Sequence, residues 1–452
     1  MTENREHWGS RFGFILAAAG SAIGLGNIWK FPHMAGQHGG AAFTLVYLIC
    51  IIVVGLPILL AEFAIGRRTQ LNPVGAFKAL SGNSQWKWVG LLGLGAAFVI
   101  LSFYSVVGGW TLKYTYLALT GAFSTFSSEN NVAAQVFNNF ISDPIQPIFW
   151  HVLFMGLCIL IINKGVKGGI ERWSKILMPL LLVLLLVLVV RGVTLEGAGE
   201  GLRFLFAPKW GDLDAEGVIL ALGHSFFTIS LGMGTMITYG SYLRRDTDLL
   251  RAALSVIVLD TVIALLAGVA IFTAVFALGQ DPAEGPGLIF VVLPTLFPLM
   301  PGGAVFGVLF FFLLFVAALT SAISILEVVT AYFIDEKGWS RSRATVTFGT
   351  IIAAVGVFAS LSLGDFNVLA PLGDLTFFDM LDGLSSKYLL PIGGLLTAIF
   401  VMKRWGLTNF MEELQAGSAW FKLPQRLVWG FFLVAGLVVA YILFDEVLGI
   451  LV

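Results

Sequence analysis

The stretch that decides the fold is GSAIGLGNIWKFP, residues 20–32. It lies inside an apolar run long enough to cross a membrane, yet it holds three glycines, an asparagine, a lysine and a proline. Glycine costs about 1 kcal/mol relative to alanine in a helix interior. Unwound backbone at membrane depth is tolerated only where it is buried in protein or lines a cavity. The stretch therefore predicts a helix broken at Gly24-Leu25-Gly26, around a cavity near the bilayer midplane.

The composition predicts a membrane protein made of helices. Of the 452 residues, 58% are hydrophobic and only 12% are charged, against about 25% charged in a soluble domain. Apolar runs of roughly 20 residues, the length that crosses a bilayer core, recur without the alternation of a membrane β-barrel. The fold class expected is an all-α polytopic bundle. The net charge of −1 gives no sign of a nucleic-acid partner, and Cys50 and Cys158 are expected to be buried thiols.

Eleven spans are expected, and the positive charges orient them. The predicted spans are 11–37, 41–66, 88–120, 147–163, 170–192, 216–242, 249–279, 302–334, 342–362, 376–402 and 427–451. With the N-terminus in the cytoplasm, all but six of the 26 Lys and Arg residues fall at the inner face, as the positive-inside rule requires. An odd number of spans then places the C-terminus outside the cell membrane.

A second interruption matches the first. The sequence FFTISLGMGTMITYGSY, residues 226–242, breaks the sixth span at Gly232-Met233-Gly234. Each break lies about 13 to 18 residues into its span, and paired interruptions in two halves point to a transporter binding site. Glycines that only allow close helix packing are the simpler alternative. A dinucleotide loop is excluded, because Trp29 stands at the third glycine position and no βαβ context surrounds it.

Several motifs together resemble the neurotransmitter:sodium symporter family, and its bacterial amino-acid branch in particular. They are GSAIGLGNIWKFP, GGAAF, GLPILLAEFAIGR, FFTISLGMG, ITYGSYLRRD and AALTSAISILE, and the resemblance covers residues 5–404. It implies a LeuT-like 5+5 inverted repeat with broken helices 1 and 6, two sodium sites and alternating access. The family usually has twelve spans, so a dimer contact built on the twelfth is in doubt. The oligomeric state stays open, a monomer included.

The repeat divides the chain into six parts. These are a cytoplasmic segment 1–10, a first five-helix repeat 11–192, an extracellular loop 193–215, a second repeat 216–404, a cytoplasmic connection 405–426 and an eleventh helix 427–452.

The resemblance assigns ligands to both sodium ions. The first site takes the substrate carboxylate with Ala22, Asn27, Thr228 and Asp260. The second takes Gly20, Ile23, Ala317, Thr320 and Ser321. The alternative is that the adjacent hydroxyls of Thr320 and Ser321 bond back to carbonyls of their own helix turn.

Asp260 departs from the asparagine common in the family at that position. A charged aspartate near the bilayer centre costs at least about 2.5–3.5 kcal/mol unless it is paired, and a bound cation would stabilise it. A structural or protonated acid is the alternative. Chloride-binding relatives hold their anion at positions occupied here by Tyr47, His224, Thr228 and Ala264. Because Ala264 replaces serine or glutamate and Asp260 supplies the negative charge, we expect transport to be independent of chloride.

The resemblance also places the substrate. Its carboxylate would bind the amides of Leu25 and Gly26, at a helix N-terminus, and the Tyr104 hydroxyl. Gly24 leaves room for that carboxylate where monoamine carriers of the family have an aspartate. The remaining contacts are the amine ligands Ala22, Phe227, Thr228 and Ser230, and a side-chain pocket of Ser21, Ile100, Phe227, Met233, Ser324 and Ile325. The pocket is apolar, and the flexible Met233 suits varied ligands, so hydrophobic L-amino acids are expected, aliphatic to aromatic and including tryptophan.

Charged pairs are expected to close both ends of the pathway. Lys30 and Asp382 resemble the outer gate, with Asp379 as the alternative partner, and Phe227 and Tyr104 form a thin lid. At the inner face Arg5 resembles the partner of Asp335, with Trp8 and Tyr242 packed around them. Surface ion pairs worth about 0–1 kcal/mol are the simpler interpretation. Glu62 is expected to accept from free amides at the second break, and Glu327 to act structurally under the inner gate.

Three functions compete at this stage. An enzyme is disfavoured, because the sequence has no HExxH, GxSxG or Cys/His cluster. A ligand-gated channel or a sensor on a transporter fold stays open. The favoured hypothesis is a sodium-coupled secondary active symporter that imports hydrophobic amino acids.

Overall fold

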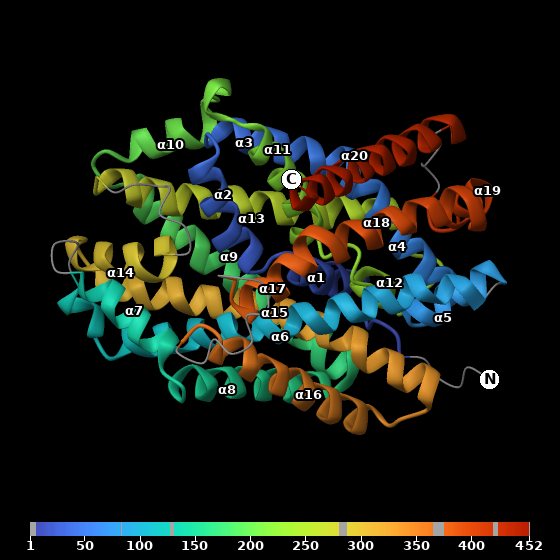
Figure 1. Ribbon diagram of the computed structural model, residues 1–452, viewed down its shortest axis with the longest axis horizontal. Helices are drawn as coiled ribbons and strands as arrows, with labels where there is room; N and C mark the ends of the chain where they lie inside the picture. The colour runs from blue at the N-terminus through green and yellow to red at the C-terminus, as the bar shows by residue number, and fades with distance from the viewer. Residues whose placement is uncertain are drawn as a thin grey trace.

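The fold is known from a computed structural model that describes residues 6–82, 84–126, 131–279, 287–364, 375–418 and 424–451. Every regular element in those ranges is helical, which confirms the all-α class. Figure 1 shows a bundle whose long helices run side by side along the horizontal axis, joined by shorter helices at both ends.

The elements are α-helices and short π- or 3₁₀-helical segments, the latter labelled η. Up to residue 193 they are α1 (Arg11–Ala22), η1 (Gly26–Lys30), α2 (Phe31–Gln37), α3 (Ala41–Cys50), η2 (Ile51–Gly55), α4 (Leu56–Thr69), α5 (Pro73–Ser81), η3 (Ser84–Trp86), α6 (Lys87–Leu119), η4 (Ala122–Thr125), α7 (Val132–Ser142), α8 (Gln146–Ile162), η5 (Val166–Glu171) and α9 (Arg172–Val193).

The remaining elements follow in the same way. They are α10 (Ala198–Phe206), η6 (Trp210–Asp212), α11 (Ala215–Thr228), α12 (Thr235–Gly240), α13 (Leu249–Ala277), η7 (Leu288–Val292), α14 (Leu293–Leu296), η8 (Phe297–Leu299), α15 (Gly303–Lys337), α16 (Arg341–Leu361), α17 (Phe377–Gly383), η10 (Leu384–Leu389), α18 (Leu390–Ile399), η11 (Phe400–Trp405), α19 (Leu407–Gln415) and α20 (Gln425–Leu451).

Helix lengths match the expected spans closely. Among the described residues, eight helices are long and apolar enough to cross a membrane, and two bent pairs raise the number to ten. One of these pairs is α1 with η1–α2, bent by 48°, as the sequence predicts. The sixth expected span corresponds to α11 and α12, which are 14 and 6 residues long and too short to span separately. The count of eleven spans stays a prediction.

The two broken helices lie at the centre of the bundle. Helix α1 packs against α9, α13 and α15, and also contacts α12; it is drawn in the middle of Figure 1. The longest helices, α6 and α15, pack against each other beside it. Both breaks are therefore surrounded by other helices of the bundle.

The connections hold helices that the sequence analysis did not predict. Helix α7 lies in the connection 121–146, α10 in 193–215, and α19 in 405–426. Helix α10 packs against α13, and α19 packs against α4. These short amphipathic helices cover the ends of the bundle.

Candidate functional site

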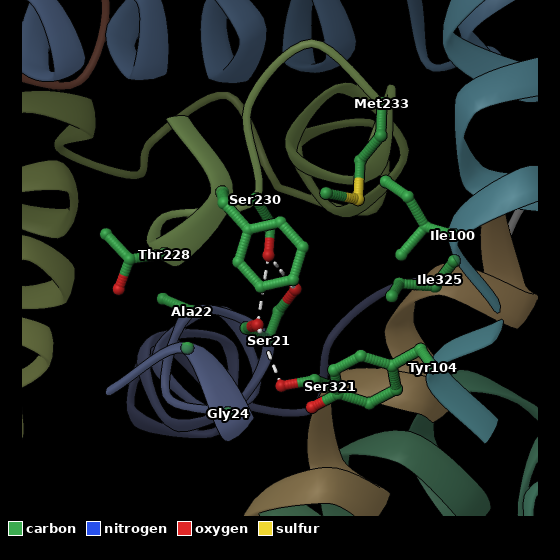
Figure 2. A pocket seen from close by; sticks show the side chains of 12 residues that line it. Ser21, Ala22, Gly24, Ile100, Tyr104, Thr228, Ser230, Met233, Ser321 and Ile325 are labelled. Atoms are coloured by element: carbon green, nitrogen blue, oxygen red, sulfur yellow. Dashed lines mark hydrogen bonds between the residues drawn. The ribbon is translucent and has the colours of Figure 1, made fainter. Parts of the chain in front are cut away.

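A central cavity lies between the two helix breaks (Figure 2), with an empty volume of about 280 Å³. Its lining combines apolar side chains with hydroxyls and exposed backbone. The residues are Ser21, Ala22, Gly24, Gly26, Ile100, Tyr104, Phe227, Thr228, Ser230, Met233, Ser321 and Ile325. Of the expected substrate contacts, Leu25 and Ser324 are absent from this lining, and Ser321 joins it.

The first break leaves backbone groups that face the cavity. Helix α1 ends at Ala22 because Ile23 is extended, with φ −76° and ψ 97°. The Leu25 amide donates to the Tyr104 hydroxyl at 3.1 Å, and the Gly24 amide donates to Asn27 Oδ1 at 3.1 Å. A Cβ on Gly24 would lie 2.4 Å from Ser321 Oγ and 2.8 Å from the Tyr104 hydroxyl. The site has no room for a side chain at that position.

The second break is a turn held by a buried carboxylate. Between α11 and α12, Ser230, Gly232 and Gly234 adopt φ values of 54°, 79° and 78°. A serine in the left-handed backbone conformation is uncommon. The Ser230 side chain is held in place by a hydrogen bond, because its Oγ donates to the Ser21 carbonyl at 2.9 Å. Glu62 accepts from the Gly232 amide at 2.8 Å, as expected. The conformation of Ser230 could not be predicted from its residue type, because serine rarely adopts it.

Asp260 lies at the centre of a buried oxygen cluster beside the first break. Asn27 Nδ2 donates to Asp260 Oδ1 at 2.8 Å, and Thr228 Oγ1 donates to the same atom at 3.0 Å. The Tyr47 hydroxyl donates to Asp260 Oδ2 at 3.3 Å. All three donors are neutral, and Asp260 is fully buried. The cluster joins a carboxylate to an amide and hydroxyls, a donor set that suits a hard cation.

A second oxygen cluster lies on the other side of α1. Ser321 Oγ is 3.4 Å from the Gly20 carbonyl oxygen, 3.1 Å from that of Ser21 and 3.5 Å from that of Ile23. Thr320 Oγ1 donates to the Ala317 carbonyl at 3.0 Å, within its own helix. Ser321 thus joins α15 to the carbonyls of Gly20, Ser21 and Ile23 at the end of α1, whereas Thr320 and Ala317 are linked only within α15.

Three serine hydroxyls form a polar strip beside the cavity: Ser21 and Ser230 line it, and Ser324 contacts Ser21 from outside the lining. Ser21 Oγ lies 2.7 Å from Ser324 Oγ and 3.2 Å from Ser230 Oγ, and Figure 2 shows the Ser21–Ser230 pair at the centre of the cavity. Met233, Ile100 and Ile325 lie together at the other end of the view. One part of the cavity is therefore hydroxyl-rich, and the other is apolar and flexible.

An ion pair lies above the cavity. Lys30 Nζ is 2.6 Å from Asp382 Oδ1, and it lies 4.4 Å from the centre of the Phe227 ring. Asp379, the alternative partner, instead caps its own helix by accepting from Thr376. Beyond Phe227 is a second hollow of about 460 Å³, which Lys30 and His224 also line. Phe227 separates the two spaces.

The opposite end of α1 is anchored by a larger network than the sequence predicts. Trp8 Nε1 donates to the Tyr239 carbonyl at 3.0 Å, and the Tyr242 hydroxyl donates to Glu327 at 2.6 Å. Arg341 pairs with Glu327 at 2.7 Å and with Glu6 at 3.0 Å. Neither Glu6 nor Arg341 was predicted to take part, because no motif links residues this far apart in sequence.

The expected pair of Arg5 with Asp335 is only partly visible. Arg5 lies outside the described residues. Asp335 accepts from the Asn72 amide at 2.8 Å and faces the start of α5. The role of Arg5 stays a prediction.

Comparison with known proteins places the chain among transporters. The family model described as "Sodium:neurotransmitter symporter family" matches residues 5–143 and 141–450. An uncharacterised sodium-dependent transporter of Bacillus subtilis (strain 168), YhdH, is 40% identical over 95% of this chain and 96% of its own length. A second sodium-dependent transporter, from Haemophilus influenzae, is 36% identical over 89% of this chain and 90% of its own. The crystal structure of MhsT in complex with L-phenylalanine matches with a TM-score of 0.89 and 47% identity, over 97% of this chain and 99% of that one.

Proposed function

Because the chain belongs to the sodium:neurotransmitter symporter family, we propose that it couples the inward sodium gradient to the import of hydrophobic L-amino acids. Membership establishes a sodium-dependent, multi-pass membrane transporter with the LeuT-like fold rather than an enzyme. The proposal adds the substrate class, the two ion sites, the direction of transport and the independence from chloride. The observation that carries it is the cavity at the first helix break, which joins a candidate ion cluster to an apolar pocket.

An amino-acid substrate is supported by the space and donors around Gly24. The Leu25 amide and the Tyr104 hydroxyl are 3.1 Å apart, so a carboxylate that lies beside both and replaces their mutual hydrogen bond could accept from each. An aspartate at position 24, as in monoamine carriers, would collide with Ser321. A substrate that brings its own carboxylate therefore suits this cavity better than an amine without one.

A hydrophobic side chain is supported by the rest of the lining. Ile100, Met233 and Ile325 form an apolar wall, and the lining contains no charged side chain that could pair with a charged substrate. Burying an apolar side chain here gains about 25 cal/mol per Å² removed from water. The similar transporter MhsT was solved with L-phenylalanine, which agrees with an aromatic ligand. L-Tryptophan and L-leucine are the two test substrates.

Two sodium ions are proposed as cargo of the same cycle. The first would bind Asn27, Thr228 and Asp260 with the Ala22 carbonyl, and the substrate carboxylate would complete its ligands. A cation here would give the buried Asp260 the charge partner that it lacks among the described residues, where its side-chain partners are three neutral donors. The second would bind between α1 and α15, at Gly20, Ile23, Ala317, Thr320 and Ser321.

Coupling would follow from the shared position of these sites. The unwound segment of α1 contributes to both ion clusters and to the substrate cavity, so each occupant fixes the backbone that the others need. Ligands that order the same segment bind cooperatively. Closure above and below would involve Phe227 with Lys30–Asp382 at one end, and Trp8, Tyr242 and Glu327 with the predicted Arg5–Asp335 pair at the other.

Independence from chloride is proposed from the Asp260 carboxylate. It lies in hydrogen-bond contact with Tyr47 and Thr228, two of the positions where chloride-binding relatives hold their anion. Because the Asp260 carboxylate already supplies a fixed negative charge at these positions, a bound chloride ion is not needed.

Uptake into proteoliposomes tests the whole proposal. We expect radiolabelled L-tryptophan and L-leucine to accumulate above equilibrium when sodium is high outside, and equally well with chloride or gluconate as the anion. A potassium gradient of the same size is the control. Passive equilibration that ignores sodium would refute a symporter and favour a channel, and a loss of uptake in gluconate would refute chloride independence alone.

A further inference from the structure

Arg191 is an unusual cation on the surface of the bundle. It lies in the last turn of α9, and its Nε is buried without a partner. Its Nη1 donates to Thr194 Oγ1 at a long 3.4 Å, and its guanidinium lies 5.8 Å from the centre of the Phe306 ring. No carboxylate in the described part of the chain pairs with it. A planar guanidinium with unused donors is suited to an anion with two acceptor oxygens.

Two apolar hollows meet at this arginine. The first is an open groove of about 750 Å³ along α9, lined by Val183, Leu186, Val187, Val190, Arg191, Thr194 and Phe306. From residue 183 to residue 191 it follows about 12 Å of helix, at 1.5 Å per residue. Its valines and leucine are exposed on the outside of the bundle, Val187 by 40% and Val190 by 62%. This groove therefore faces the hydrocarbon of the membrane.

The second hollow leads inward from the same point. It is a narrow cleft between α9, α13, η8 and α15, and it must widen to admit anything larger than a few atoms. Leu188, Ala274, Leu293, Phe297 and Met300 contribute to its walls, and Arg191 and Phe306 line it as they line the groove. One cation thus stands where two apolar spaces join.

We infer that Arg191 and these two hollows form a binding site for one diacyl glycerophospholipid. The phosphate would accept from the Arg191 guanidinium, one acyl chain would follow the groove along α9, and the other would enter the hollow behind η8. One anionic group with two apolar chains has the same layout as one cation with two apolar spaces. A free anion would use the arginine but neither hollow, and a single-chain detergent would leave one hollow unfilled.

A lipid bound at this site would stabilise the segment η7–α14–η8, which covers the inner hollow. The inner hollow is closed by Leu293, Phe297 and Met300, at the end of the bundle that carries α7, α10 and α14 in Figure 1. A chain lodged behind these residues would hold η7, α14 and η8 in place against α13. In the proposed orientation the lipid comes from the outer leaflet, so the composition of that leaflet would act on the extracellular end of the transporter.

Native mass spectrometry of the delipidated full chain in detergent tests the head-group contact. We expect added 1-palmitoyl-2-oleoyl phosphatidylglycerol to bind as one adduct, and Arg191→Gln to weaken that adduct about tenfold, the effect of losing one charge-assisted contact. Arg203→Gln, at an exposed arginine on α10, is the matched control and should bind like the wild type. Equal binding by Arg191→Gln would overturn the inference, and so would competition by inorganic phosphate, which would indicate a site for free anions.

The two acyl chains are tested by filling each hollow separately. Val187→Trp blocks the groove from an exposed position, and Ala274→Leu fills the inner hollow. We expect each to weaken binding of the diacyl lipid at least about threefold while leaving the one-chain lysophosphatidylglycerol within twofold of the wild type, because one hollow stays open. Dioleoylglycerol, which has no phosphate, should not bind. If neither variant changes the diacyl adduct, the two-chain assignment is wrong even where Arg191 contributes.

Discussion

The two helix breaks use the same glycine pattern for different physical reasons. At Gly24 the φ angle is not left-handed, but a Cβ would lie 2.4 Å from Ser321 Oγ. Glycine is required there for space. At Gly232 and Gly234 φ is 79° and 78°, so glycine is required for a backbone conformation that other residues adopt at a cost. The first break preserves room for a ligand, and the second maintains a turn.

The polar partners of the two breaks differ in the same way. In the first, the Leu25 amide donates to Tyr104, a side chain that lines the central cavity and that a ligand can displace or share. In the second, the Gly232 amide donates to Glu62, which lines a separate small hollow behind the break. We infer that the first break exchanges partners during transport while the second keeps its own. Four substitutions test this difference.

The largest effect is expected from Gly24→Val. Its side chain must displace Ser321 and Tyr104, so L-tryptophan binding in sodium should weaken at least about 100-fold, equivalent to about 2.7 kcal/mol. Isothermal titration measures the affinity. Gly95→Val, at an exposed position of α6, is the control, because a Cβ there meets nothing within 4 Å. An unchanged affinity in Gly24→Val would show that the space at the first break is not the binding site.

Gly232→Ala should instead act on stability. Left-handed backbone costs a non-glycine residue about 1–2 kcal/mol, and the new Cβ would lie 2.2 Å from the Leu390 carbonyl oxygen. We expect a total loss of about 2 kcal/mol or more, seen as a lower thermal unfolding midpoint in detergent. Gly430→Ala, with open space around its Cβ, should unfold like the wild type. If Gly232→Ala is as stable as the wild type but does not bind substrate, the second break serves ligand binding rather than the stability of a turn.

Glu62→Ala removes the permanent partner of the second break. The buried Gly232 amide then loses its acceptor, which costs about 1–3 kcal/mol, and the unfolding midpoint should fall accordingly. Glu62→Gln keeps an acceptor oxygen and should recover most of that loss. If both variants unfold like the wild type, Glu62 does not stabilise the turn.

Tyr104→Phe should have the smallest effect on affinity. It removes one hydroxyl from the proposed carboxylate contact, so the Kd for L-tryptophan should rise about tenfold, or about 1.4 kcal/mol. The buried Leu25 amide also loses its acceptor, so the unfolding midpoint of the ligand-free protein should fall as well. Tyr116→Phe, on the exposed face of the same helix, provides the matched control, and equal affinities in the two variants would remove Tyr104 from the site.

Local sequence could predict the spans and the breaks because both follow from composition along a single segment. Apolar length marks each helix, and Gly24 and Gly232 with polar neighbours mark the interruptions. The cavity residues Ile100 and Met233 carry no such signal, since each would be an ordinary core residue in isolation. They were placed only through resemblance to a family.

Features that depend on tertiary pairing could not be predicted. Arg341 joins Glu6 and Glu327 across three segments, and each charge alone looks like a surface residue. Ser230 adopts a left-handed conformation that its own preferences disfavour, and the surrounding contacts impose it. The choice of Asp382 over Asp379 as the partner of Lys30 also depended on helix geometry, because Asp379 caps its own helix.

The central claim is that one unwound segment binds substrate and sodium together. Titrating L-tryptophan into the purified transporter at a series of sodium concentrations, with potassium holding the ionic strength constant, tests it most directly. We expect an apparent Kd that falls steeply as the sodium concentration rises, and no measurable binding in potassium alone. The same Kd in sodium and in potassium would contradict it.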